Sequence, residues 1–78
     1  GDFVFYTGAA FPAWNGQAII AGLVCECLVR VGIDGERASE LDRIPLGKRI
    51  RDVAQAPDGA LWVLEDGARA RLRQIRPR

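Results

Sequence analysis

The short spacing of turn signals is the feature that most constrains how this chain can fold. Asp-Gly pairs occur at residues 34–35, 58–59 and 66–67, and nine Gly and four Pro interrupt the 78 residues. No apolar pattern at i, i+3, i+4 and i+7 is sustained between them, so amphipathic helices are not predicted. The intervening segments are short and rich in apolar, β-branched and aromatic residues, which is typical of strands. The sequence therefore predicts an all-β fold.

The predicted strands fall into a group of four and a group of three. They are residues 3–8, 17–23, 25–33, 38–46, 49–56, 60–66 and 70–77. Tight turns between them make every strand antiparallel to its neighbour. Repeated four-stranded units of ~40 residues are the cadence of β-propeller blades. We therefore predict one four-stranded blade over residues 1–46 and three strands of the following blade over residues 47–78.

Size and charge exclude several classes of function. Eleven basic and ten acidic residues give a net charge of +1, so binding to nucleic acid through bulk charge is not expected. No apolar run approaches the ~18 residues of a membrane span. No Ser/His/Asp set, phosphate-binding glycine loop or carboxylate pair is present, and the chain has no His. We therefore expect no catalytic residue within this chain, and its Gly-Asp start without Met indicates a piece of a longer product.

Arg49 and Arg51 are the candidate binding residues. In an extended strand they lie on one face, with Ile50 on the opposite face. The innermost strand of a propeller blade begins near a mouth of the central channel, where two guanidinium groups would form a bidentate clamp for carboxylates or phosphates. The alternative is a solvated turn in which one arginine pairs with Asp52 or Glu65.

Cys25 and Cys27 form a C-x-C pair on a predicted strand. Residues two apart on a strand have Cβ atoms ~6–7 Å apart, whereas a disulfide needs ~3.8 Å. We therefore expect two small apolar residues of a core or interface. Intermolecular pairing and metal capture are the alternatives, although no His is present to complete a metal site.

The C-terminal arginines are expected to be solvated. Arg69, Arg71 and Arg73 share one face of a predicted strand. Single-stranded nucleic acid would require interleaved aromatic residues for base stacking, and none is present there. The pattern therefore favours a solvated outer face.

Four stretches of the sequence resemble a known family. They are FYTGAAFPAWNG, QAIIAGL, LVRVGIDGER and KRIRDVAQAPDGALWVLED. In this order they resemble the C-terminal part of the soluble aldose sugar dehydrogenases that depend on pyrroloquinoline quinone (PQQ), the glucose/sorbosone dehydrogenase family. The resemblance implies about one and three-quarter blades of a six-bladed β-propeller. It also implies a parent enzyme that oxidises the C1 hydroxyl of aldoses to lactones, with PQQ as hydride acceptor and Ca²⁺ polarising the quinone.

The resemblance assigns the cofactor contacts to Arg49 and Arg51, the two arginines of the R-x-R-D motif. Some family members also carry a cofactor-contacting Lys at the position of Val24. The catalytic His and the Ca²⁺ ligands belong to other blades. The resemblance therefore implies that this chain holds part of a PQQ site and is inactive on its own.

The expected partners follow from the same resemblance. They are the remaining propeller blades and an aldose substrate, in a parent protein that is periplasmic or secreted. One alternative is a non-catalytic β-propeller module that binds protein or carbohydrate. Another is self-association of the piece through its open blade edge.

Overall fold

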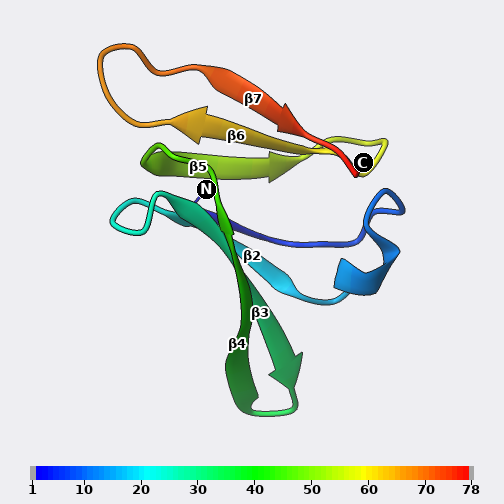
Figure 1. Cartoon of the computed structure of the whole chain (residues 1–78). Coiled ribbons are helices and arrows are strands. Elements are labelled where there is room, and N and C mark those ends of the chain that lie inside the picture. The colour runs from blue at the N-terminus through cyan, green and yellow to red at the C-terminus, as the bar shows by residue number, and fades with distance from the viewer. Residues whose placement is uncertain (1, 78) are drawn as a thin grey trace.

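Residues 2–77 are described by a computed structural model, and they form two antiparallel sheets (Figure 1). The strands are β1 (Phe3–Phe5), β2 (Ala18–Gly22), β3 (Cys27–Asp34), β4 (Arg37–Pro45), β5 (Ile50–Gln55), β6 (Leu61–Glu65) and β7 (Leu72–Ile75), and a 3-10 turn, η1, covers Pro12–Trp14. The order is β1-β2-β3-β4 in the first sheet and β5-β6-β7 in the second. The all-β prediction and its grouping into four and three strands are confirmed.

The turns lie where the Asp-Gly pairs predicted them. Gly35, Gly59 and Gly67 have φ angles of +61°, +89° and +110°, in the left-handed region that glycine adopts without a steric penalty. They lie in the β3–β4, β5–β6 and β6–β7 connections. Pro45 is the last residue of β4, as expected of a residue that cannot donate to a sheet ladder.

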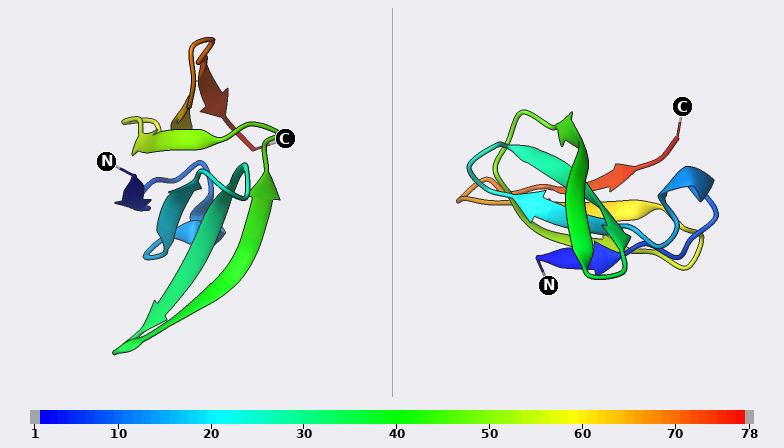
Figure 2. Two further views of the ribbon diagram at one scale, coloured as in Figure 1. Left: turned by 90° about the vertical axis from the view of Figure 1, so that its left-hand side faces the viewer. Right: turned by 90° about the horizontal axis from the view of Figure 1, so that it is seen from below.

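The core lies between the two sheets, with β5 next to β1 and β2 (Figure 1). Its buried side chains come from both sheets and are Tyr6, Ile19, Leu28, Ile50, Val53, Leu61 and Val63. The β3–β4 hairpin extends away from the second sheet, and the residues of β4 are almost all exposed (Figure 2). Apolar side chains also remain exposed outside this core, among them Phe3, Phe5, Leu64 and Leu72.

Exposed polar contacts also join the sheets. The Thr7 amide donates to the Gln55 side-chain oxygen at 2.9 Å, and the Gln55 amide nitrogen donates to the Thr7 hydroxyl at 3.2 Å. Next to them Gly8 approaches Gly59 so closely that a Cβ on Gly8 would lie 2.6 Å from the Gly59 Cα. The absence of a side chain at Gly8 therefore allows this close approach.

The expectation for Cys25 and Cys27 is wrong, because they form a disulfide with Cα atoms 5.2 Å apart. Cys25 lies in the turn between β2 and β3 rather than on a strand. Glu26 has a φ of +54°, and this bend removes the extended spacing on which the expectation rested. Gly22 leaves room for the bridge, since a Cβ there would overlap the Cys25 sulfur. The disulfide therefore joins the turn to the first residue of β3, and neither cysteine is a free thiol.

Candidate functional site

The two candidate arginines lie at the start of β5, at one edge of the second sheet. Both side chains are exposed, and Ile50 between them is fully buried, as the alternation predicted. The Arg49 carbonyl accepts a hydrogen bond from the Asp66 amide at 2.8 Å, and its Nε lies 3.8 Å from the Asp66 carboxylate. The alternative that paired an arginine with Asp52 or Glu65 is therefore wrong for Arg49, whose partner is Asp66.

Arg51 is the extra residue of a β-bulge. Ile50 pairs with Glu65 and Asp52 pairs with Leu64, so Arg51 has no opposite residue on β6. Bulges of this kind bend a strand and redirect its side chains, and they are frequent next to active sites. The Arg51 side chain lies on the exposed side of the strand, next to buried Ile50, and the bulge lets Ile50 and Val53 both face the core.

A shallow hollow of about 380 Å³ lies beside this edge. Its lining residues are Lys48, Glu65, Asp66, Gly67, Ala68, Arg69 and Arg71. Three of them are cationic, and both carboxylates are engaged, Asp66 with Arg49 and Glu65 with Arg71. Together with Arg49 and Arg51, the edge presents more positive than negative side chains, which favours an anionic ligand.

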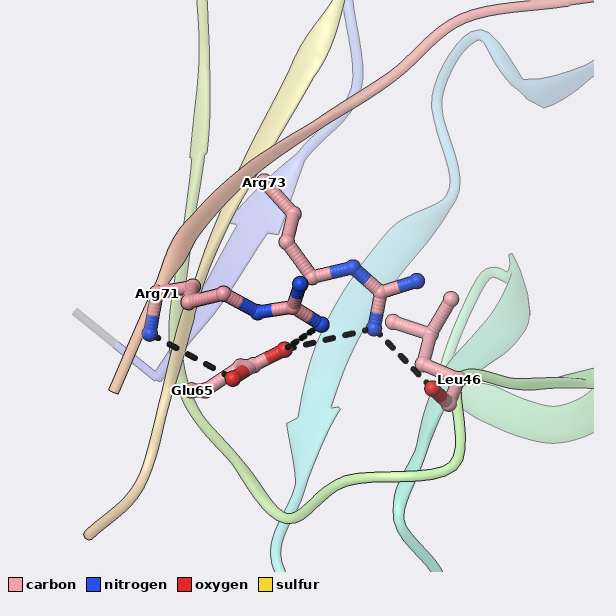
Figure 3. A network of polar contacts seen from close by, with 4 residues as sticks. All are labelled: Leu46, Glu65, Arg71 and Arg73. Atoms are coloured by element: carbon pink, nitrogen blue, oxygen red, sulfur yellow. Dashed lines mark hydrogen bonds and ion pairs between the residues drawn. The ribbon is translucent and has the colours of Figure 1, made fainter. Parts of the chain in front are cut away.

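A buried carboxylate lies under the same edge. Glu65 is only 3% exposed, and its two oxygens face two arginines from the β7 side of the sheet (Figure 3). The Arg71 amide donates to Oε1 at 3.3 Å and the Arg71 guanidinium to Oε2 at 3.4 Å, while the Arg73 guanidinium lies 3.6 Å from Oε2. The predicted solvated face is therefore wrong for Arg73, whose side chain is only 30% exposed and lies against Glu65, whereas the Arg71 side chain pairs with Glu65 and stays 70% exposed.

The charge state of Glu65 follows from these contacts. Burial alone would raise the pKa of its carboxyl group, because a buried charge loses hydration. The hydrogen bond and charge of Arg71, the Arg71 backbone N–H and the charge of Arg73 outweigh burial, and the pKa lies below its ordinary value of 4.5. Glu65 is therefore an anion at neutral pH.

Val24 lies in the β2–β3 turn, where its side chain is 93% exposed. This turn meets the β4–β5 connection, since the Leu46 amide donates to the Glu26 carbonyl at 2.9 Å. The connection leads directly to Arg49. The structure thus links the turn that carries Val24 to the segment that carries the candidate arginines.

Comparison with known proteins identifies the family. The sequence model for glucose/sorbosone dehydrogenases matches residues 1–74. This chain belongs to that family. The matched range includes Arg49, Arg51 and the Glu65 network.

Similar proteins include an enzyme of Escherichia coli. The chain is 36% identical over 76 residues to the aldose sugar dehydrogenase YliI of E. coli K12, covering 95% of this chain and 20% of that protein. It is 35% identical over 72 residues to an uncharacterized protein of Synechocystis, covering 90% of this chain and 17% of that protein.

The fold also matches a solved structure. The crystal structure of the soluble aldose sugar dehydrogenase from E. coli, in its apo form, superposes with a TM-score of 0.87 at 35% identity, covering 97% of this chain and 22% of that one. The chain therefore spans about a fifth of the length of the relatives it matches. The two sheets thus match a fragment of a larger sugar dehydrogenase structure.

Two further properties concern the described range. Within residues 2–77 no helix is long and apolar enough to cross a membrane. Over the same residues no group of three or more His, Cys, Asp or Glu side chains is arranged to hold a metal ion.

Proposed function

We propose that this chain is part of a PQQ-dependent sugar dehydrogenase that oxidises aldoses at C1 to lactones, and that it contributes Arg49 and Arg51 to the PQQ site. Family membership supports the reaction class. The observation that carries the site is the bulge in β5, which holds the Arg51 guanidinium on the exposed side of a strand whose other side is buried.

The residues present suit this cofactor. PQQ is a tricarboxylate, and a guanidinium group is permanently charged and matches a carboxylate with two parallel N–H groups. The Arg49 side chain approaches the Asp66 carboxylate through Nε at 3.8 Å and is more than half exposed, so its terminal nitrogens can reach a ligand. When bound, PQQ supplies the quinone that accepts the hydride. Arg49 and Arg51 hold carboxylates and stabilise negative charge near the cofactor.

The remainder of the reaction is assigned to other parts of the parent protein. The chain has no His, so the base that takes the substrate proton, and the Ca²⁺ ligands, come from other blades. We further propose that residues 1–46 form one blade of a six-bladed propeller and residues 47–78 three strands of the next. The exposed apolar side chains of Phe3, Phe5 and Leu72 support neighbouring blades as partners. On its own, the chain is expected to be inactive.

The disulfide supports a periplasmic or secreted parent. Disulfides form and persist in oxidising compartments and are rare in the cytosol. The Cys25–Cys27 bridge is therefore consistent with export. Loss of the bridge in a reducing compartment would leave two free thiols, that of Cys25 in the β2–β3 turn and that of buried Cys27 at the start of β3.

The test is PQQ binding by the full-length apo-protein. Arg51→Ala removes one charge-assisted contact, which is expected to cost about 1.5–3 kcal/mol, or roughly 10- to 150-fold in the dissociation constant. Arg37→Ala, in the exposed β3–β4 hairpin, is the matched control and should leave binding unchanged. Equal PQQ affinity of the two variants would remove Arg51 from the cofactor site.

Dye-coupled aldose oxidation by the same protein tests the reaction. Activity that requires both PQQ and Ca²⁺ is the expected result. If a panel of aldoses gives no activity and PQQ does not bind, the proposal fails and a non-catalytic binding module takes its place.

A further inference from the structure

We propose that Arg73, held by the buried carboxylate of Glu65, is a positioning residue that fixes the chain segment carrying Arg49 and Arg51. This inference rests on the proposed PQQ site. It assigns to the Glu65–Arg73 pair a role in cofactor affinity, although neither residue is placed in contact with the cofactor.

The first observation is the bond from Arg73 to the β4–β5 connection. The Arg73 guanidinium donates to the Leu46 carbonyl oxygen at 2.9 Å (Figure 3). The Leu46 amide donates to the Glu26 carbonyl in the β2–β3 turn of the first sheet, also at 2.9 Å. The amide of Leu46 is therefore bonded toward the first sheet and its carbonyl toward the second. The bond toward the second sheet depends on one side chain, that of Arg73.

The second observation is the anchor behind Arg73. One of its terminal nitrogens, Nη1, lies 3.6 Å from Glu65 Oε2 and also makes the bond to Leu46. An arginine side chain has several rotatable bonds, and fixing it costs conformational entropy. The ionised carboxylate, 4% exposed, offsets that cost and holds the guanidinium in place.

The third observation connects this anchor to the candidate arginines. Glu65 is paired with Ile50, the residue between Arg49 and Arg51. The next residue, Asp66, donates its amide to the Arg49 carbonyl at 2.8 Å. The segment from 46 to 49 is therefore bonded at both ends to the part of the second sheet that Glu65 organises.

The segment needs such restraint because of Gly47. Its φ is +75°, and nothing lies within 4 Å of the position that a Cβ would occupy. Glycine in open space has wide backbone freedom. Without the bond to Arg73, the chain could rotate at Gly47 and move the backbone that leads to Arg49.

Stability alone is a weak explanation for this arrangement. Burying ion pairs costs hydration, and apolar residues of similar volume often stabilise a core equally well or better. Leu61 and Val63 precede Glu65 on the buried face of β6, so an apolar residue would fit this pattern. A role in fixing one backbone conformation accounts for the carboxylate at position 65.

The test compares three substitutions in the full-length apo-protein, using equilibrium PQQ binding as the readout. Arg73→Met keeps the apolar stem but removes both contacts, and we expect PQQ affinity to fall roughly 2- to 30-fold, the range for residues that modulate a site without touching its ligand. Arg73→Lys should recover part of the loss, because it keeps the charge. Arg76→Met, directly after β7, removes an exposed pair with Asp58 and should leave affinity unchanged.

A double-mutant cycle distinguishes positioning from general loss of stability. Glu65→Gln should weaken PQQ binding in the same direction, and combination with Arg73→Met should add little, because both changes release the same bond. Melting temperature and the KM for aldose in the PQQ-loaded enzyme are followed in parallel. The KM should change less than the PQQ affinity.

Each outcome separates the two proposals. If Arg51→Ala weakens PQQ binding but Arg73→Met only lowers the melting temperature, the positioning role is overturned and the PQQ site stands. Fully additive losses in the cycle also overturn it. If neither Arg51→Ala nor Arg49→Ala changes PQQ binding, the proposed site itself fails. A Met variant that does not fold is replaced by Arg73→Lys, whose PQQ affinity must then lie below that of the wild type.

Discussion

The hydroxyl of Tyr6 donates a hydrogen bond to the carbonyl oxygen of Gly59 at 2.6 Å, joining the two sheets at a fully buried point. The Tyr6 hydroxyl oxygen in turn accepts a hydrogen bond from the Phe11 amide at 2.9 Å. The Tyr6 ring meets Phe11 and Trp14 edge to face, and these two rings stack with centroids 4.1 Å apart. One side chain thus holds the end of the first strand, the aromatic loop and the β5–β6 turn together.

Tyr6→Phe tests this junction. The ring packing is kept, but the Gly59 carbonyl and the Phe11 amide each lose a buried partner, so the free energy of unfolding is expected to fall by about 1–3 kcal/mol. Denaturant unfolding of the full-length protein measures it. Thr7→Val, which removes an exposed contact with Gln55, should change it by less than about 0.5 kcal/mol. Equal effects of the two changes would contradict the prediction.

Gly8→Ala is expected to push the sheets apart. The new Cβ would lie 2.6 Å from the Gly59 Cα and 2.7 Å from the Tyr6 hydroxyl, and a backbone atom cannot move aside as a flexible side chain can. Overpacking of this kind costs about 1–3 kcal/mol of unfolding free energy. Gly35→Asn is the control, because that turn is open and Asn tolerates its positive φ. A thermally neutral Gly8→Ala variant would show that the junction can relax.

Removal of the disulfide should have a small effect. The bridge closes a loop of only three residues, and a loop this short is expected to contribute about 1–2 kcal/mol. Cys25→Ala with Cys27→Ala is compared with the wild type, with and without reductant. Reductant should lower the wild-type unfolding free energy by a similar amount and leave the double variant unchanged. A loss of unfolding free energy above about 4 kcal/mol would mean that the disulfide stabilises parts of the fold beyond the β2–β3 turn.

Glu65 makes the stability of the second sheet dependent on acid. Its pKa in the folded protein lies below the ordinary value of 4.5, since Arg71 and Arg73 outweigh burial. Its stabilising contribution is therefore complete above that value and is lost as the pH falls through the lower folded pKa. The difference in unfolding free energy between wild type and Glu65→Gln should be constant near neutral pH and shrink in acid. A difference that grew on acidification would reverse the sign of the shift.

The turn chemistry made most of the fold predictable. Asp-Gly pairs place glycine where positive φ is required, and the strands between them follow within a few residues of their predicted ends. The disulfide was missed because an extended strand was assumed through Cys25. Glutamate is not a residue type that predicts a positive φ, so the bend at Glu26 could not be expected from the sequence. Local propensity describes strands well but does not report where one ends in a bend.

The buried network could have been found from the sequence. One face of β6 carries Leu61, Val63 and Glu65, and the first two are core residues. The alternation of a strand therefore predicts that Glu65 is buried too, and a buried carboxylate needs a cationic partner. The bulge had a signal as well, since buried Ile50 and Val53 are three residues apart and cannot share a face of a regular strand. The partners of Glu65 depend on the β6–β7 register, which the sequence does not specify.

The bulge also shows that the pairing of β5 with β6 does not depend on Arg51. If Arg51 were deleted, Ile50, Asp52 and Val53 would follow one another in regular alternation, with Ile50 and Val53 still directed to the core and opposite the same residues of β6. The ladder is complete without it. The pairing of β5 with β6 therefore accommodates Arg51 without using it, and its side chain is left exposed outside the sheet, free of any part in the ladder.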